Sequence, residues 1–184
     1  AYNNNAEAQY KCGLMYFNGE GVTRSYEAAA KWYRKAADNN YVHAQYNLGL
    51  MYFKGDGVVK SYGEAIKWYK KAADLNYAKA QYNLGLMYLK GEGVTQSYEE
   101  AVKWFIKSAE NNYSQAQYNL GYIYYKGTGV AQSYEKAAKW YKEAAKNGDI
   151  DAQYILGNLY YDGEGVVQSY EKAIKWYRKA ADNN

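Results

Sequence analysis

The chain has 184 residues, enough for one ordinary domain, and 48% of them are hydrophobic, which suffices for a packed core. The net charge is only +4, and no stretch forms the basic block that nucleic-acid binding requires. No apolar run approaches the roughly 18 residues of a membrane span, so we expect neither nucleic-acid binding nor membrane insertion.

The tripeptide Ala-Gln-Tyr occurs five times, and each copy begins 36 residues after the previous one. The copies begin at Ala8, Ala44, Ala80, Ala116 and Ala152. The five tryptophans keep the same spacing: Trp32, Trp68, Trp104, Trp140 and Trp176. A fixed period of roughly 20–50 residues predicts a stacked repeat array. We therefore expect side chains that recur in register to be scaffold, and side chains that break the register to carry individual function.

The first half of each copy has the pattern of an amphipathic helix. In the second copy, which spans Val42–Tyr77, apolar residues at helical spacing share one face. These are Ala44, Leu48, Met51 and Tyr52. Gly49 lies in the middle of this helix, where glycine costs up to about 1 kcal/mol relative to alanine. Because the same glycine recurs in every copy, we expect a neighbouring helix to come very close to it.

A glycine-rich turn and a second helix follow. The first helix is expected to end at Gly55-Asp56-Gly57, because glycine supplies the left-handed turn that other residues resist. Ser61 is then a good N-cap, and Glu64 three residues later completes a capping box. The second helix carries apolar residues at helical spacing: Ala65, Trp68, Tyr69, Ala72 and Ala73. Asn76 and Tyr77 turn the chain into the next copy.

Each copy therefore predicts a hairpin of two helices of about 12 residues with short connections. Stacking the hairpins buries an apolar face that neither helix covers alone. We predict an all-α fold of five helix-turn-helix repeats of 36 residues, forming one domain over residues 1–184. The repeats are 6–41, 42–77, 78–113, 114–149 and 150–184.

The pattern Ala-x-x-x-Leu-Gly-x-x-Tyr-x-x-Gly-x-Gly-Val, followed by Tyr-x-x-Ala-x-x-Trp-Tyr-x-x-Ala-Ala, resembles the Sel-1-like repeat, a relative of the tetratricopeptide repeat. The resemblance covers residues 6–184. It implies a right-handed α-solenoid whose concave groove is lined mainly by the first helix of each hairpin. It also implies a non-catalytic scaffold or adaptor, which here would bind a protein ligand in this groove as an extended peptide or a helix.

Two features bear on catalysis and metal binding. Ser133 with Lys136, and Ser169 with Lys172, spell Ser-x-x-Lys, the nucleophile motif of β-lactamases. The other copies keep the serine without the lysine, which favours a helix cap. Some secreted relatives are penicillin binders with a disulfide in each repeat, whereas this chain has one cysteine. Penicillin-binding or β-lactamase-like activity is thus a remote alternative, and we expect no enzyme, no cofactor and, with His43 the only histidine, no metal site.

Peptide-binding residues are predicted on the first helices of the three central repeats, from helix geometry together with the resemblance. In the second repeat they are Tyr46, Asn47, Leu50 and Lys54. In the third they are Tyr82, Asn83, Leu86 and Lys90, and in the fourth Tyr118, Asn119, Tyr122 and Lys126. The wider face includes Glu7, Tyr10, Lys11, Leu14, Phe17, Asn18, His43, Phe53, Lys79, Leu89, Gln115, Tyr125, Asp151, Tyr154, Ile155, Asn158, Tyr161 and Asp162. Several of these slots change identity between copies, as recognition positions do, although drift on a solvated face produces the same variation.

The predicted asparagines, tyrosines and lysines each recur at one slot of successive first helices, and we call each such series a ladder. Each ladder has two interpretations. The asparagines are expected to bind the backbone of an extended peptide, or alternatively to bond within their own repeat. The tyrosines line the groove or pack between repeats. The lysines attract acidic groups of a partner, or complement the dipole at the helix end. A further hypothesis is a purely structural or end-to-end self-associating array, because the last helix, with Ile174 and Trp176, has no polar capping helix after it.

Overall fold

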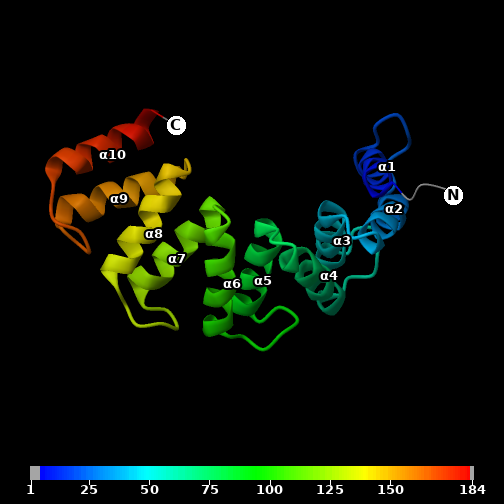
Figure 1. The fold of residues 1–184 in the computed structure, drawn as a ribbon, viewed down its shortest axis with the longest axis horizontal. Coiled ribbons are helices and arrows are strands. Elements are labelled where there is room, and N and C mark those ends of the chain that lie inside the picture. Colours follow the sequence, from blue (N-terminus) through cyan, green and yellow to red (C-terminus); the bar gives the residue numbers. More distant parts are fainter. Residues whose placement is uncertain (1–4, 183–184) are drawn as a thin grey trace. The chain divides into compact units, whose positions relative to one another are not determined.

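The computed structural model describes residues 5–182, which form ten α-helices of 13 residues each and no strand (Figure 1). The helices are α1 (Ala6–Asn18), α2 (Tyr26–Asp38), α3 (Val42–Lys54), α4 (Tyr62–Asp74), α5 (Ala78–Lys90), α6 (Tyr98–Glu110), α7 (Ser114–Lys126), α8 (Tyr134–Lys146), α9 (Ile150–Asp162) and α10 (Tyr170–Asp182). The predicted all-α fold of the solenoid class, with five helix-turn-helix repeats, is confirmed.

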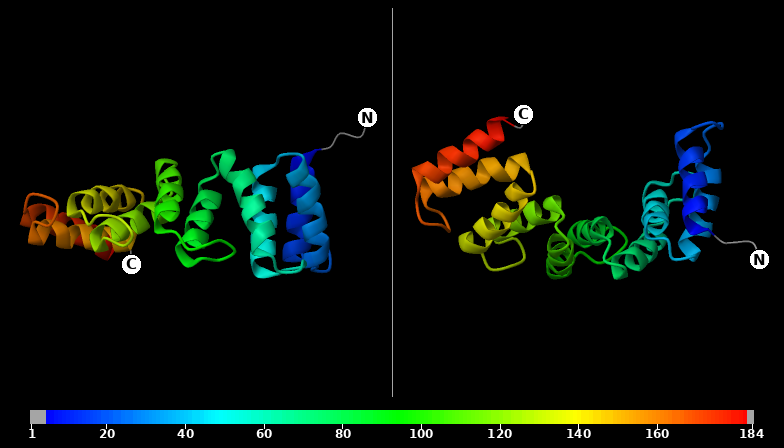
Figure 2. Two further views of the ribbon diagram at one scale, coloured as in Figure 1. Left: turned by 90° about the horizontal axis from the view of Figure 1, so that it is seen from below. Right: turned by 45° about the horizontal axis from the view of Figure 1, so that its top comes forward.

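The helices cluster into two compact units. The first unit holds the described residues up to Leu84 together with Gly91–Thr95, and the second holds Gly85–Lys90 and the described residues from Gln96 onward. Within each unit the two helices of a hairpin lie side by side, as α1 and α2 or α9 and α10 do in Figure 2. The single domain over residues 1–184 stays a prediction.

Each first helix buries small and aliphatic residues and admits a ring from its partner helix. In α3, Ala44 and Leu48 are completely buried. A Cβ on Gly49 would lie 2.7 Å from the ring of Tyr69 on α4. The same relation joins Gly13 to Tyr33, Gly85 to Phe105, Gly121 to Tyr141 and Gly157 to Tyr177. The predicted close approach is confirmed, and an aromatic ring makes it.

Glycine is required again where the loop of one hairpin meets the hairpin before it. Gly57 has a φ of 66°, and a Cβ at this position would overlap the backbone of Tyr26 at the start of α2. Gly165 has the same relation to Tyr134 at the start of α8. The second glycine of Gly-x-Gly therefore permits both the left-handed turn and the stacking of hairpins.

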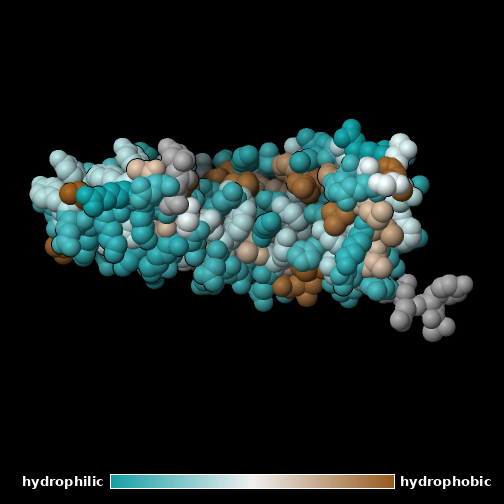
Figure 3. Space-filling view, turned by 90° about the horizontal axis from the view of Figure 1, so that it is seen from above, coloured by the Kyte–Doolittle hydropathy of each residue, from teal (hydrophilic) through white to brown (hydrophobic). Residues whose placement is uncertain are grey.

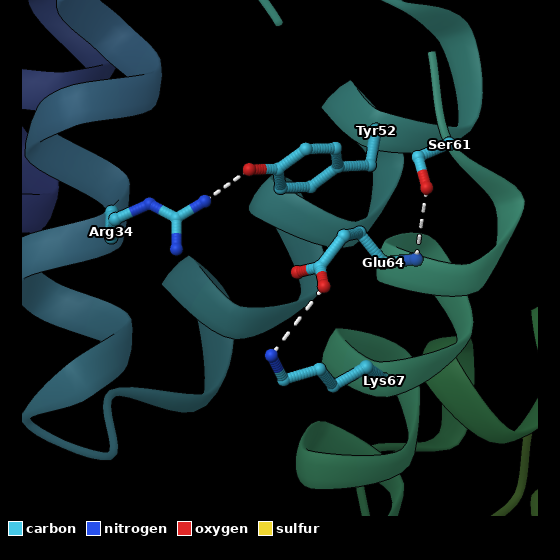
Figure 4. Close-up of polar contacts among 5 residues, drawn as sticks. All are labelled: Arg34, Tyr52, Ser61, Glu64 and Lys67. Carbon is cyan, nitrogen blue, oxygen red and sulfur yellow. Dashed lines mark hydrogen bonds and ion pairs between the residues drawn. The ribbon is translucent and has the colours of Figure 1, made fainter. Parts of the chain in front are cut away.

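The tryptophans contribute less to the core than their spacing suggested. Only Trp68, at 2% exposure, is buried, and Arg34 lies 5.7 Å from its ring. Four others are half-buried: Trp32, Trp104, Trp140 and Trp176. Arg34 also donates to the hydroxyl of Tyr52 on α3, a bond drawn in Figure 4. In the described second helices, the ring that enters the core is the residue after the tryptophan, as with Tyr33 and Tyr141, each 1% exposed.

The glutamine of Ala-Gln-Tyr joins neighbouring hairpins. Gln45 is 1% exposed, and its Nε2 donates to the carbonyl oxygen of Ala37 near the end of α2, at 3.3 Å. Equivalent bonds join Gln81 to Ala73, Gln117 to Ala109 and Gln153 to Ala145. The last carbonyls of a helix have no intrahelical donor. The buried amide provides one while tying each first helix to the preceding second helix.

Apolar side chains are mostly withdrawn from the surface. The face drawn in Figure 3 is largely hydrophilic, and its hydrophobic residues form separate patches. Tyrosines supply much of the exposed ring surface, including Tyr122, Tyr154 and Tyr161, which are 48%, 57% and 53% exposed. The exposed surface drawn in Figure 3 is therefore mainly polar, with tyrosine rings and separate apolar patches.

Candidate binding cavities on the first helices

The predicted tyrosine ladder packs against other rings. The centroid of Tyr46 lies 5.8 Å from that of Tyr69 on α4 and 5.2 Å from that of Tyr77 at the start of the next hairpin. Tyr118 lies 5.6 Å from Tyr141. These contacts favour the packing interpretation. Because Tyr46 and Tyr118 are only half-buried, part of each ring also faces outward.

The predicted asparagines link neighbouring hairpins. Nδ2 of Asn47 donates to the hydroxyl of Tyr10 at 3.4 Å. Burial raises the pKa of Tyr33 to about 12, and a hydrogen bond with Asn47 partly opposes that rise. Asn83 likewise opposes the rise in the pKa of Tyr46 and Tyr69 that burial causes, and Asn119 at the same slot is half-buried. For Asn47 the alternative of a bond within the same repeat is wrong, because its hydrogen bond runs to the preceding repeat.

The remaining predicted slots differ in exposure. Leu50 and Leu86 are half-buried, whereas Tyr122 at the same slot is 48% exposed. The predicted lysines are exposed in the last turns of their helices: Lys54 in α3, Lys90 in α5 and Lys126 in α7. Nζ of Lys126 lies 5.5 Å from the ring centroid of Tyr125, a cation–π contact.

The first unit contains a cavity of about 160 Å³ between α1, α2 and α3, which we term the first cavity. Its lining is mainly apolar and includes two predicted residues of the second repeat. The lining residues are Leu14, Phe17, Asn18, Tyr33, Asn47, Leu50, Met51 and Asp56.

The second unit contains a larger cavity of about 320 Å³, which we term the second cavity. It lies between α7, α8 and α9 and is rich in tyrosine and charge. The lining residues are Tyr118, Tyr122, Tyr125, Lys126, Tyr141, Ile155, Asn158, Leu159, Asp162 and Glu164.

The two cavities occupy equivalent places in the repeats. Each of the eight residues that line the first cavity has a counterpart in the second cavity 108 residues later, which is three repeats of 36. The linings differ in chemistry: Tyr122 stands for Leu14, Ile155 for Asn47, and Asn158 for Leu50. The scaffold thus repeats the cavity while the sequence changes what lines it.

The structure divides the predicted residues into two groups. Five line one of the two cavities: Asn47, Leu50, Tyr118, Tyr122 and Lys126. Seven line neither of them: Tyr46, Lys54, Tyr82, Asn83, Leu86, Lys90 and Asn119.

Three lining slots escaped the sequence analysis. They are the pairs Tyr33 and Tyr141, Met51 and Leu159, and Asp56 and Glu164. An aromatic residue recurs in every copy at the slot of Tyr33, and an aliphatic residue or methionine recurs at the slot of Met51. Both slots were therefore interpreted as part of the hydrophobic core. The acidic slot is the middle residue of Gly-x-Gly, which is threonine in the fourth repeat. That change of identity was the signal that could have found it.

Among residues 5–182 no three His, Cys, Asp or Glu side chains are grouped so that they could hold a metal ion. None of the described helices is both long enough and apolar enough to cross a membrane. Oγ of Ser133 accepts from the backbone N–H of Lys136 at 3.2 Å, and Ser169 caps its helix in the same way. The serines of Ser-x-x-Lys are therefore helix caps.

Comparison with known families agrees with the repeat geometry. A model of the Sel1 repeat matches residues 6–41, 42–77, 78–113, 114–149 and 150–184. The chain belongs to the Sel1 repeat family. Members of this family generally act as scaffolds for protein–protein interaction and are generally non-catalytic. No curated protein sequence matches this Sel1 repeat chain.

Solved structures include close relatives. A protective antigen present in uropathogenic Escherichia coli strains is 38% identical, with a TM-score of 0.92 over 96% of this chain. The chain spans only 38% of the length of that antigen. A Sel1 repeat protein from Oxalobacter formigenes is also 38% identical, with a TM-score of 0.90 over 98% of this chain and 74% of its own. Helicobacter pylori cysteine rich protein B is 29% identical, with a TM-score of 0.53 over 68% of this chain and 90% of its own.

Proposed function

We propose that this Sel1 repeat chain is a non-catalytic scaffold that binds a segment of a partner protein, as an extended peptide or a helix, along its first helices. The observation that supports this proposal is the repetition of one cavity, at the same slots, in each unit. Side chains that anchor in such cavities supply most of the binding energy at protein interfaces. Because the two cavities have the same position in the repeat but different linings, each would prefer a different side chain of the partner.

The two cavities suit different anchors. Leu14, Phe17 and Leu50 give the first cavity an apolar wall that fits an aliphatic side chain. In the second cavity, tyrosines and carboxylates replace much of that wall, which fits a polar or charged side chain. The two cavities therefore prefer different anchor residues.

The asparagines are part of this proposal, but they are poor positions for testing it. An amide has two donor hydrogens and an acceptor oxygen, so one side chain can serve both a tyrosine and a peptide backbone. Asn47 already donates to Tyr10, and the amide of Asn83 acts on the pKa of Tyr46. Substituting them would disturb hairpin packing together with binding, so Leu50 and Tyr122 are better test positions.

The test begins with peptides selected from a displayed random library on the wild-type chain. Leu50→Glu or Tyr122→Glu should weaken the selected peptides at least about tenfold by isothermal titration calorimetry, because each change buries a charge at an anchor site. Lys70→Glu and Lys142→Glu are matched controls at one exposed slot of α4 and α8. Circular dichroism checks that helicity is kept. Equal losses at the cavity and control positions would contradict the proposal.

A second candidate function is end-to-end self-association. Ile174 on α10 is 52% exposed, whereas Ile66 and Val102 at the same slot are 9% and 7% exposed. Met15 on α1 is 42% exposed, whereas Met51 is 2% exposed. These slots form the contact between successive hairpins elsewhere. Pairing the exposed face of α10 in one copy with that of α1 in another would give a head-to-tail arrangement.

Sedimentation equilibrium tests this second candidate. The average mass of the wild type should rise with concentration, and Ile174→Glu or Met15→Glu alone should abolish the rise, because a head-to-tail contact uses both faces. A mass that stays monomeric at every concentration argues against self-association and leaves the peptide-binding proposal untouched.

A further inference from the structure

The second cavity contains a hydroxyl that the first cavity does not leave open. In the first cavity Asn47, which donates to the hydroxyl of Tyr10, also acts on the hydroxyl of Tyr33 and opposes the rise in its pKa. In the second, Ile155 occupies the slot of Asn47, and no described residue forms a hydrogen bond with the hydroxyl of Tyr141. Tyr141 is only 1% exposed and lines the cavity. The hydroxyl of Tyr141 is therefore open to the cavity rather than enclosed by protein atoms, and a ligand in the cavity can form a hydrogen bond with it.

Aromatic rings make the same cavity attractive to a cation. Tyr118, Tyr122 and Tyr125 line it together with Tyr141. The face of an aromatic ring carries negative charge density, which attracts ammonium and guanidinium groups. Lys126 already shows this attraction, with its Nζ 5.5 Å from the centroid of Tyr125.

Negative charge dominates around these rings. Asp162 and Glu164 line the cavity, and Lys126 is the one basic residue among its described lining. Burial raises the pKa of Tyr118, and the carboxylates of Asp151 and Asp149 raise it further. A carboxylate from a ligand would be repelled here, whereas a cation would be attracted.

We propose that the second cavity is a recognition pocket for an arginine side chain of the partner segment. This inference rests on the proposed function, because it names the chemistry of one anchor of that segment. The tyrosine rings, the carboxylates of Asp162 and Glu164 and the open hydroxyl of Tyr141 carry it together. The cavity volume of about 320 Å³ lies at the low end for ligand pockets and suits a single long side chain.

Arginine fits better than lysine on the geometry of its head group. The planar guanidinium stacks on an aromatic ring and still presents several donors at its edge. Tyr125 donates to Oε2 of Glu164 at 3.1 Å, which holds that carboxylate at the cavity wall. One edge of the guanidinium then donates to Glu164, and another N–H donates to the hydroxyl oxygen of Tyr141.

The primary test compares two short peptides on the wild-type chain. The probes are acetyl-Gly-Arg-Gly-amide and the same peptide with citrulline, which keeps the shape of arginine but carries no charge. In titrations of ¹⁵N-labelled protein, the arginine peptide should shift the backbone amides of Tyr122, Asn158 and Glu164. The citrulline peptide should bind at least about tenfold more weakly. Equal affinities, or shifts confined to the first unit, would overturn the proposal.

Matched variants test the named groups. Tyr141→Phe and Glu164→Gln should each weaken the arginine peptide several-fold, while the equivalent changes in the first cavity, Tyr33→Phe and Asp56→Asn, should leave its affinity unchanged. A Glu164→Gln variant that binds arginine and citrulline peptides as the wild type does also overturns the proposal. If a variant fails to fold, the peptide comparison on the wild type still decides.

A fifth variant tests why the pocket is open. Ile155→Asn places an amide where Asn47 stands in the first cavity, so it should engage the hydroxyl of Tyr141 and weaken the arginine peptide. Unchanged affinity for this peptide in folded Ile155→Asn protein counts against the role given to that hydroxyl.

This inference and the proposed function fail in different ways. Arginine-selective binding of the tripeptide, with no longer peptide selected on either cavity, would leave the pocket standing and remove the scaffold proposal. Selected peptides that bind through the cavities, with no preference for arginine over citrulline, would support the scaffold proposal and contradict the arginine pocket.

Discussion

The position that directly follows the second helix of a repeat decides whether a buried glutamine finds a hydrogen-bond donor. The Oε1 atom of Gln117 accepts from Asn147 at 2.9 Å, and that of Gln9 accepts from Asn39 at 3.0 Å. Both asparagines follow the second helix of their own repeat. The second repeat has a leucine at this slot, and Oε1 of its buried Gln45 has no hydrogen-bond partner among the described residues. One substitution between copies therefore leaves a buried acceptor unsatisfied.

Restoring the asparagine should stabilise the chain. Leu75→Asn places an amide donor beside Oε1 of Gln45, and little packing is lost because Leu75 is 52% exposed. A hydrogen bond to a buried acceptor contributes about 1 kcal/mol, so the free energy of unfolding in urea should rise by about that amount. The reciprocal change, Asn147→Leu, should lower it similarly. A loss of stability in Leu75→Asn would show that the acceptor is satisfied in another way.

The connection between two helices depends on a serine that serves both. Oγ of Ser61 accepts from the N–H of Glu64 at 3.3 Å, while the N–H of Ser61 donates to the carbonyl oxygen of Tyr52 near the end of α3 at 2.9 Å. Glu64 turns to Lys67, with 3.5 Å between the charged groups (Figure 4). The predicted N-cap is confirmed. The reciprocal half of the capping box is wrong, because Tyr52 already accepts from the N–H that Glu64 was expected to bind.

This geometry predicts unequal costs for the two capping residues. Ser61→Ala removes the acceptor for an N-terminal N–H and should destabilise the chain by about 1 kcal/mol. Glu64→Gln keeps the N–H of residue 64 capped and loses only an exposed ion pair, so its effect should stay below about 0.5 kcal/mol. Urea unfolding of the two variants measures both. A Glu64→Gln cost equal to that of Ser61→Ala would restore the full capping box.

Helix positions were predictable because local chemistry determines them. Apolar spacing and the Gly-x-Gly turn placed the first helix of the second repeat before Gly55, and α3 ends at Lys54. The choice of core ring was not predictable, because Trp104 and Phe105 both follow the helical spacing and only packing against Gly85 decides between them. The cavities were not predictable for a related reason. The predicted binding residues all lie on first helices, whereas Tyr141 of the second helix α8 also lines the second cavity.

Across the whole molecule, buried phenols are a shared feature of the two units. The chain has 26 tyrosines, and three of them, Tyr33, Tyr69 and Tyr141, each receive a helical glycine against their ring and are 1% exposed. Burial is the main reason that the pKa of each is raised, to about 12 for Tyr33 and further for the other two. In these three hairpins, the ring that packs against the helical glycine therefore also links the stability of the fold to pH.

The sign of this linkage follows from where the protons bind. A folded-state pKa above the unfolded value of 10 means that the folded chain holds its phenolic proton more tightly, so the stabilisation is complete below about pH 10 and is lost as the pH rises toward 12. A tenfold tighter hold on one phenolic proton in the folded chain corresponds to about 1.4 kcal/mol of stability. Urea unfolding followed by circular dichroism should show a falling free energy across that window, while tyrosinate absorbance appears together with unfolding. Tyr33→Phe removes one titrating group and should make the fall less steep, although it lowers stability at neutral pH by losing the bond to Asn47. A free energy of unfolding that stays constant from pH 10 to pH 12 would mean that the phenols ionise within the folded chain, and that the rings against the helical glycines are less enclosed than the structure shows.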